Sequence, residues 1–209
     1  VRNTTGNALV IANGVNSTGL LVMADEGARL NSMGTVSVLG NSGDGTILIS
    51  NGIANLKGLS MANAVGSRGQ VLVEDGQLIL PTNGLTVGAS GVGSLTLAHT
   101  EAYLENVYST PNTILGGNAG GQGALYLSNG LARLRALQVG GNGVGYAEVQ
   151  AATLLVDDTL FIPNSTVIQQ YGNGADADIA YDGSSIYTVQ GATATNAWIG
   201  NLGGAQTRN

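Results

Sequence analysis

The stretch Ile49-Ser50-Asn51-Gly52-Ile53-Ala54-Asn55-Leu56-Lys57 returns in similar form as Leu127-Ser128-Asn129-Gly130-Leu131-Ala132-Arg133-Leu134-Arg135. In both copies, apolar side chains alternate with small or polar ones around a central Asn-Gly pair. Alternation with a period of two predicts a β-strand, because successive side chains of a strand point to opposite faces. Asn-Gly tolerates positive φ and predicts a corner. The stretch therefore predicts a repeated unit of strand, corner and strand.

A wider pattern contains this unit: Gly, any residue, apolar, any residue, apolar. The intervals between its copies are 24, 24, 30 and 22 residues, and the copies begin at Gly45, Gly69, Gly93, Gly123 and Gly145. An imperfect earlier copy, residues 7–11, has Asn7 in place of the leading glycine. The regular spacing predicts a repeat architecture, in which each unit is one coil of a stack.

Two further features recur at fixed places in the repeat. Corners of the Asn-Gly or Asp-Gly type follow the leading position: Asn13-Gly14, Asn51-Gly52, Asp75-Gly76 and Asn129-Gly130. An apolar residue with a glycine, then a short turn of Gly, Asn and Ser, precedes each full copy: Leu39-Gly40, Val65-Gly66, Val87-Gly88, Leu115-Gly116 and Val139-Gly140. Each coil is therefore expected to contain a strand, a corner, two further strands and a glycine turn.

These patterns predict an all-β fold, a right-handed parallel β-helix (β-solenoid) of roughly 22–30-residue coils. Stacking coils about 4.8 Å apart would pair backbone groups between them and align the buried Leu, Ile and Val side chains. An up-and-down or sandwich β fold would explain the alternation, but it gives no reason for a repeat of 22–30 residues with corners at fixed offsets. We expect degenerate N-terminal rungs in residues 1–33, the solenoid repeats in 34–162, and either irregular rungs or a cap in 163–209.

The composition limits the possible functions. With 34 glycines, 10% charged residues and 43% apolar residues, the chain suits short strands and tight turns rather than disorder. The net charge of −6 argues against nucleic acid as a partner. The absence of cysteine excludes disulfides and cysteine-based zinc sites. No apolar run is long enough to span a membrane as a helix. The chain starts Val1-Arg2-Asn3-Thr4-Thr5, which predicts that any signal peptide has been removed.

The order of these features resembles the autotransporter passenger-associated β-strand repeat. The best matches are residues 39–52, from Leu39-Gly40 to Asn51-Gly52, and residues 87–97, from Val87-Gly88 to Leu97. The resemblance covers residues 34–149. It implies a bacterial surface passenger that crosses the outer membrane through a β-barrel and acts in adhesion or self-association. Related solenoids occur in phage fibres and in polysaccharide-processing proteins, so the motif indicates the fold more specifically than the function.

Acidic residues are the first candidates for chemistry, since a β-helix that cleaves polysaccharides needs two or three carboxylates in one groove. The candidate pairs are Glu74 with Asp75, Glu101 with Glu105, and Asp157 with Asp158. None recurs at matching offsets in adjacent coils, and a turn role already accounts for Asp75. The acidic stretch 173–183 could offer oxygen ligands to Ca²⁺, but its spacing matches neither the EF-hand loop nor the glycine-rich nonapeptide repeat, so a solvated turn is favoured.

The remaining candidates also have simpler explanations. His99 falls at a corner position, where tolerance of positive φ would explain it. Arg133 and Arg135 alternate along a strand, with Lys57 at the matching offset of another coil, and they predict a small cationic patch or a solvated face. The glycine clusters 116–117 and 120–121 resemble phosphate-binding loops only in composition. We therefore assign no catalytic, cofactor-binding or metal-binding residue and expect no cofactor.

The first functional hypothesis is a non-enzymatic β-solenoid scaffold, secreted or on the bacterial cell surface, that mediates adhesion or self-association. Its partners would be host or bacterial surface molecules or copies of itself, and it could form a homo-oligomer or fibre. The second hypothesis is a structural subunit of an extracellular or phage fibre. The third is a polysaccharide lyase or hydrolase. The expected location is extracellular, in association with the outer membrane.

Overall fold

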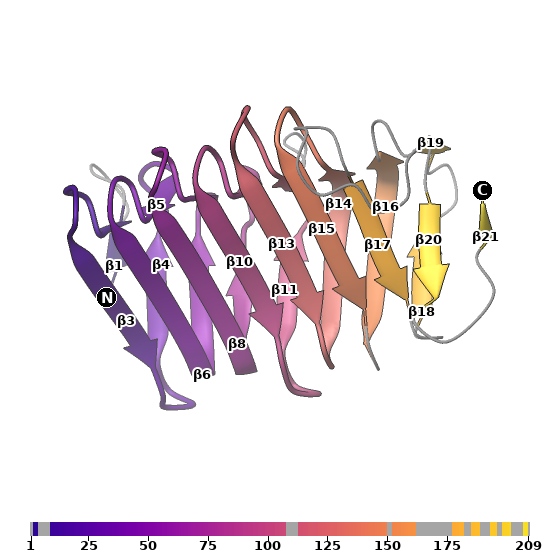
Figure 1. Ribbon diagram of the computed structural model, residues 1–209. Helices are drawn as coiled ribbons and strands as arrows, with labels where there is room; N and C mark the ends of the chain where they lie inside the picture. Colours follow the sequence, from indigo (N-terminus) through magenta and orange to yellow (C-terminus); the bar gives the residue numbers. More distant parts are fainter. Residues whose placement is uncertain are drawn as a thin grey trace.

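The computed structural model describes residues 2–3, 9–107, 113–149, 152–161, 177–181, 185–188, 193–195, 198–201 and 207–208. Every regular element in these ranges is a β-strand, and parallel strands stack as a β-solenoid of about six turns. In Figure 1 the strands in front run down the page and those behind run up, while the chain advances from left to right. This winding is right-handed. The predicted all-β, parallel β-solenoid fold is confirmed.

Each coil has three faces, which we name A, B and C. Face A begins with the leading glycine strand of the repeat. Its strands are β3 (Thr18–Met23), the first half of β6 (Asp44–Leu56), the first half of β8 (Arg68–Ile79), β10 (Val92–Leu97), β13 (Gln122–Leu127), β15 (Val144–Val149), β17 (Ala177–Tyr181) and β20 (Trp198–Asn201). We number coils 1–6 by their face A strands, from β3 to β15.

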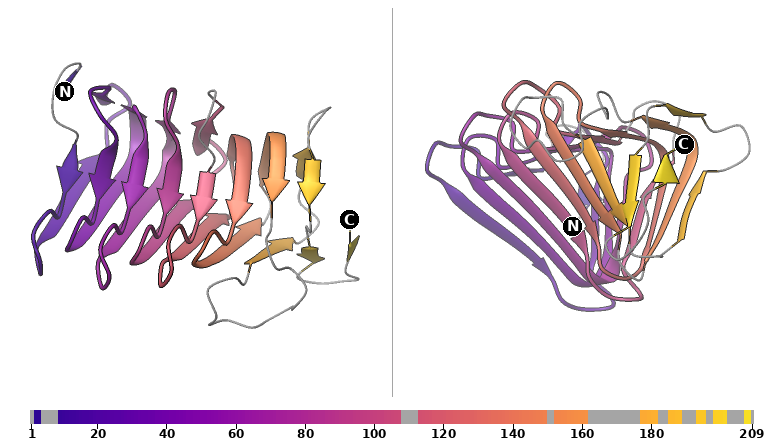
Figure 2. Two further views of the ribbon diagram at one scale, coloured as in Figure 1. Left: turned by 90° about the horizontal axis from the view of Figure 1, so that it is seen from above. Right: turned by 45° about the vertical axis from the view of Figure 1, so that its right-hand side comes forward.

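Faces B and C complete each coil. Face B contains β1 (Arg2–Asn3), β4 (Arg29–Ser32), the second halves of β6 and β8, β11 (Tyr103–Asn106), the start of β14 (Leu131–Val139), the start of β16 (Thr153–Phe161) and β18 (Ser185–Thr188). Face C contains β2 (Val10–Ile11), β5 (Ser37–Leu39), β7 (Leu59–Met61), β9 (Leu85–Val87), β12 (Thr113–Leu115), the ends of β14 and β16, and β19 (Thr193–Thr195). β21 (Thr207–Arg208) pairs antiparallel with β20. Figure 2 shows the three faces enclosing the interior.

The leading glycines form one column along face A. Gly45 pairs with Gly69, and the register continues through Gly93 and Gly123 to Gly145. A Cβ on Gly93 would overlap the backbone of Gly88, which explains why a glycine is needed where the chain leaves the glycine turn. The column therefore fixes the register between coils.

The first full copy of the pattern lies earlier in the chain than predicted, before Gly45. Gly19 pairs with Gly45, so residues 19–23 are a full copy of the pattern. Residues 7–11, read as an imperfect copy, are not equivalent to it, because Val10 and Ile11 form β2 on face C, in register with Val38 and Leu39. The sequence match failed there because alternation alone does not distinguish one face of a coil from another.

The interior is filled by the side chains that point inward, every second one along the described strands. Leu95 and Leu97 have no exposed surface, and Leu95 lies in register between Val71 and Leu125. Such aligned rows give continuous apolar contact from coil to coil. One polar pair is buried among them, in which the Asn106 side-chain amide donates to the Thr113 hydroxyl at 3.1 Å.

The glycines after the face C strands allow the chain to turn back toward face A. Gly40, Gly88, Gly116 and Gly140 have φ between 69° and 78°. Val65-Gly66 was predicted to be the equivalent of Leu39-Gly40, and this prediction is wrong. Met61 is the residue in register with Leu39, and Val65 is 85% exposed. Ala62 follows Met61 and takes the left-handed conformation itself, with φ of 56°.

The predicted corners are also less uniform than their sequences. Gly52 and Gly130 have φ of 98° and 87°, as expected of an Asn-Gly corner. Gly76 does not have a positive φ, although it is in register with Gly52. Close packing accounts for this glycine, because a Cβ there would lie 2.5 Å from Cγ2 of Ile49.

Asparagines stack at the glycine turns of the first coils. The Asn41 side-chain amide donates to Oδ1 of Asn13 at 2.8 Å, and that of Asn63 donates to Oδ1 of Asn41 at 3.4 Å. Such amide ladders extend the hydrogen bonding between stacked strands into the side chains. They reinforce the register that the glycine column sets.

Candidate functional site

The outer surface of face A consists of three rows of side chains along the solenoid axis. They occupy the positions before the leading glycine (edge row), after it (middle row) and three residues after it (far row), because strand side chains alternate. From coil 1 to coil 6 the edge row is Thr18, Asp44, Arg68, Val92, Gln122 and Val144, the middle row is Leu20, Thr46, Gln70, Ser94, Ala124 and Tyr146, and the far row is Val22, Leu48, Leu72, Thr96, Tyr126 and Glu148. Only Asp44, Arg68 and Glu148 among them are charged.

A groove of about 430 Å³ lies on this surface over coils 4–6. Its floor is formed by the middle row, which in coils 4 and 5 holds the small side chains of Ser94 and Ala124. These project less than the side chains of the neighbouring rows. Tyr146 occupies the same row in coil 6 and stands at the end of the floor. The side walls come from the other two rows, namely Val92, Gln122 and Val144 on the edge side and Tyr126 and Glu148 on the far side.

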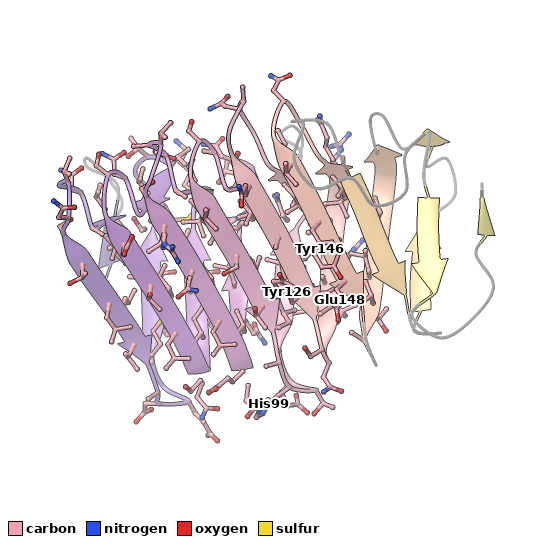
Figure 3. The ribbon with its side chains drawn as sticks, in the orientation of Figure 1. His99, Tyr126, Tyr146 and Glu148 are labelled. Atoms are coloured by element: carbon pink, nitrogen blue, oxygen red, sulfur yellow. The ribbon has the colours of Figure 1, made fainter. Side chains whose placement is uncertain are left out.

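Tyr126 on the far side and Tyr146 at the end of the floor meet as an aromatic wall at one corner of the groove. Their ring centroids lie 5.8 Å apart, and the ring planes are tilted by 54°. The Tyr146 hydroxyl donates a hydrogen bond to Oε2 of Glu148 at 2.9 Å. Figure 3 shows these three side chains on the front sheet, away from His99 at the lower corner. The groove thus combines aromatic surface, a positioned carboxylate and small polar groups.

Neither a family model, nor a curated protein, nor a solved structure matches this chain. The resemblance to the autotransporter repeat therefore stays a prediction. Within the part of the chain that the structure describes, no three His, Cys, Asp or Glu side chains form a group that could hold a metal ion. No helix in those ranges is long and apolar enough to cross a membrane.

Of the predicted acidic pair Glu74 and Asp75, at the corner within β8, Asp75 contacts the histidine. Nδ1 of His99 lies 3.1 Å from Oδ2 of Asp75, and both side chains are about half exposed, at 55% and 42%. His99 does not have a positive φ, so the expected reason for a histidine at this corner is wrong. The contact joins the corners of coils 3 and 4 at the surface, outside the face A groove.

The predicted pair Glu101 and Glu105 is separated. Glu101 is exposed on the corner, whereas Glu105 lies on face B and accepts a hydrogen bond from the Tyr103 hydroxyl at 2.5 Å. Glu105 is in register with Arg133, whose Nε donates to Oδ2 of Asp157 at 3.1 Å. These four side chains form a charged cluster on face B. The side chain of Asp158 lies outside the described residues.

The face B cluster predicts a pH effect that can be measured. Burial, together with the hydrogen bond to Glu105, raises the pKa of Tyr103 from 10.0 to about 12. The unfolded chain then loses this proton before the folded chain does, so stability falls as the pH rises from about 10 to about 12. Urea unfolding across that range should show a shallower fall for Tyr103→Phe than for the unaltered chain. Parallel curves would contradict the assignment.

Lys57, Arg133 and Arg135 do not form one cationic patch, because the lysine lies far along the solenoid from the arginines. Lys57 lies in coil 2, where its Nζ donates to the carbonyl oxygen of Gly34 at 3.2 Å. Arg133 and Arg135 lie in coil 5, and the ion pair of Arg133 with Asp157 lowers the net positive charge there. Three coil spacings of about 4.8 Å separate the lysine from the arginines.

The remaining sequence candidates have structural roles or lie elsewhere. Gly116 has a φ of 72°, and a Cβ on Gly121 would overlap the carbonyl oxygen of Gly88, so both glycines serve the turn. Of the acidic stretch 173–183, only the backbone of Ala177–Tyr181 is described, as β17, and the rest lies outside the described residues. A second hollow of about 280 Å³ lies beside the glycine turns, between Asp44 and Arg68.

Tyr126, Tyr146 and Glu148 were not among the residues predicted from the sequence. The sequence nevertheless contains a signal for them. Tyr126 lies three positions after the leading glycine Gly123, and Tyr146 and Glu148 lie one and three positions after Gly145. Alignment of all copies on that glycine places the three side chains on the outer surface of neighbouring strands. Only the inward positions of the repeat are constrained to be apolar, so the outward residues do not repeat and are not recognised from the pattern.

Proposed function

We propose that the chain is a non-enzymatic β-solenoid scaffold, secreted or held on a bacterial cell surface, that mediates adhesion or self-association. The observation that carries this proposal is that the middle and far rows of face A carry no charge in coils 1–3. Leu20 and Val22 are 68% and 49% exposed, and Val22, Leu48 and Leu72 adjoin one another along the far row. A continuous apolar strip on a flat sheet is a feature of surfaces that bind other molecules.

A second copy of the chain is the partner that this surface fits best. Two flat sheets pack face to face about 10 Å apart, and the middle and far rows of coils 1–3 hold no charge that would have to be desolvated. On the edge row, exposed Asp44 is in register with exposed Arg68 of the next strand. A two-fold axis between them would bring each residue opposite the other kind on the second copy. The surface is therefore complementary to itself in both charge and apolarity.

The strip can be tested with matched lysine substitutions. Leu48→Lys and Leu72→Lys each place a charge in the strip of Val22, Leu48 and Leu72. Ile53→Lys is the control, because Ile53 is an outward aliphatic residue on face B of the same coil as Leu48. Burying a leucine contributes about 1.5–3 kcal/mol, so each strip variant should weaken association at least about tenfold. Sedimentation equilibrium of the purified chain measures the constant, and sedimentation of cells that display the chain reports adhesion.

Three outcomes would contradict this proposal. The unaltered chain could remain monomeric over the whole concentration range without causing cells to aggregate. The strip variants could associate as strongly as Ile53→Lys. Electron micrographs could show end-to-end filaments that persist in Leu48→Lys, which would favour the fibre-subunit hypothesis instead.

A further inference from the structure

We infer that the groove over β10, β13 and β15 binds a saccharide unit, with the sugar ring against the tyrosines and its hydroxyls on the surrounding polar groups. This inference is independent of the self-association strip, which lies on coils 1–3. It rests on the aromatic pair, on the distribution of polar groups along both walls, and on the shape of the floor.

The tyrosines supply an apolar surface that faces outward. Tyr126 and Tyr146 come from adjacent strands, and both are partly exposed. Their tilt of 54° prevents parallel stacking of the two rings, so ring surface stays open toward the groove. Aromatic side chains with one polar end are well suited to ligands that have both an apolar face and hydroxyl groups.

The polar groups match hydroxyls on both sides of such a ligand. The Tyr146 hydroxyl donates to Glu148 at 2.9 Å and so holds the carboxylate beside the aromatic wall, and carboxylate oxygens are good acceptors for hydroxyl groups. Gln122 and Ser94, on the opposite wall and the floor, can each donate and accept. Sugar hydroxyls also donate and accept, so one saccharide can use all of these groups.

A cationic ligand fits this arrangement less well. A quaternary ammonium group would interact with the faces of Tyr126 and Tyr146 and with Glu148. It has no hydrogen-bonding group to offer Gln122 or Ser94, which line the same groove. The presence of polar side chains away from the aromatic wall therefore favours a polyhydroxylated ligand.

The shape also favours a ring lying flat. The floor of Ser94 and Ala124, over the column of glycines Gly93 and Gly123, leaves space beside the projecting tyrosines. The volume of about 430 Å³ lies within the usual range of small-molecule sites, about 300–1,000 Å³. Glu148 is the one carboxylate among the described lining residues, whereas the two-carboxylate mechanism of glycoside cleavage needs a pair. The groove is thus suited to binding a saccharide without cleaving it.

Titration calorimetry on the full chain tests the inference, with a panel of lactose, maltose, cellobiose and chitobiose and with tetramethylammonium chloride. We expect at least one disaccharide to bind, and Tyr126→Ala to weaken that binding at least about tenfold, since aromatic contacts dominate such sites. Tyr103→Ala is the matched control, because Tyr103 is an outward tyrosine of the same solenoid on face B. It should leave the affinity unchanged.

A second variant separates loss of the site from loss of the fold. Ala124→Leu raises the floor of the groove at an outward position and should block binding while thermal unfolding stays as in the unaltered chain. The inference is overturned if no disaccharide of the panel binds, if Tyr126→Ala and Ala124→Leu bind as tightly as Tyr103→Ala, or if tetramethylammonium alone binds. Because the strip on coils 1–3 is unchanged in these variants, self-association should persist in all of them.

Discussion

Gly88→Ala is expected to lower the free energy of unfolding by about 3–5 kcal/mol, an effect in the range of the most damaging single substitutions. Gly88 has a φ of 70°, where an alanine is strained by about 1–2 kcal/mol. In addition, its Cβ would overlap the carbonyl oxygen of Gln122 in the next coil. Neither group can move away, because both belong to the backbone ladder. Urea unfolding followed by circular dichroism measures the loss.

Gly66→Ala is the control that separates the two causes. Gly66 has a similar φ of 82°, but nothing lies within 4 Å of the position its Cβ would take. The strain of about 1–2 kcal/mol is partly offset by the lower entropy of the unfolded chain, so the loss should be about 1 kcal/mol. Equal losses in the two variants would show that close packing of the coils at Gly88 does not matter.

Leu95→Ala is expected to lower the free energy of unfolding by about 3–4 kcal/mol, as for other leucines truncated in closely packed cores. Leu95 has no exposed surface and lies between Val71 and Leu125 in one inward row. The stacked backbones hold the neighbouring coils apart, so the cavity cannot collapse. Thr96→Ala changes the adjacent outward residue and should alter stability by less than about 0.5 kcal/mol. A comparable loss from Thr96→Ala would mean that the outer rows also hold the coils together.

The fold could be predicted because its strongest constraints act on residue types that the sequence displays. Gly93 is required where backbones meet, and inward positions such as Leu95 must be apolar, so both recur at fixed offsets. The prediction failed where another residue took the place of glycine. Ala62 adopts the left-handed conformation with φ of 56°, which most sequences reserve for glycine, and Val65-Gly66 imitated the missing pair three residues later.

The candidate groove was harder to predict for a related reason. Outward residues such as Ser94, Ala124 and Tyr146 occupy one row, yet nothing in the packing requires them to be alike. Alternation therefore indicates that they are exposed but not what they do. The contact of Tyr126 with Tyr146 also joins residues of neighbouring coils, and it depends on ring orientation, which the spacing of the sequence does not contain.

The column of leading glycines has a consequence for how such a chain can change in length. Gly45, Gly69 and the glycines that follow pair with the neighbouring coils in the same parallel register. The backbone pairing on face A is therefore equivalent from one coil to the next. We therefore expect that duplication or removal of a whole coil keeps the backbone pairing between the remaining coils and shifts everything beyond it by about 4.8 Å. The number of coils would then set the distance between the strip of coils 1–3 and the groove of coils 4–6, in steps of about 4.8 Å.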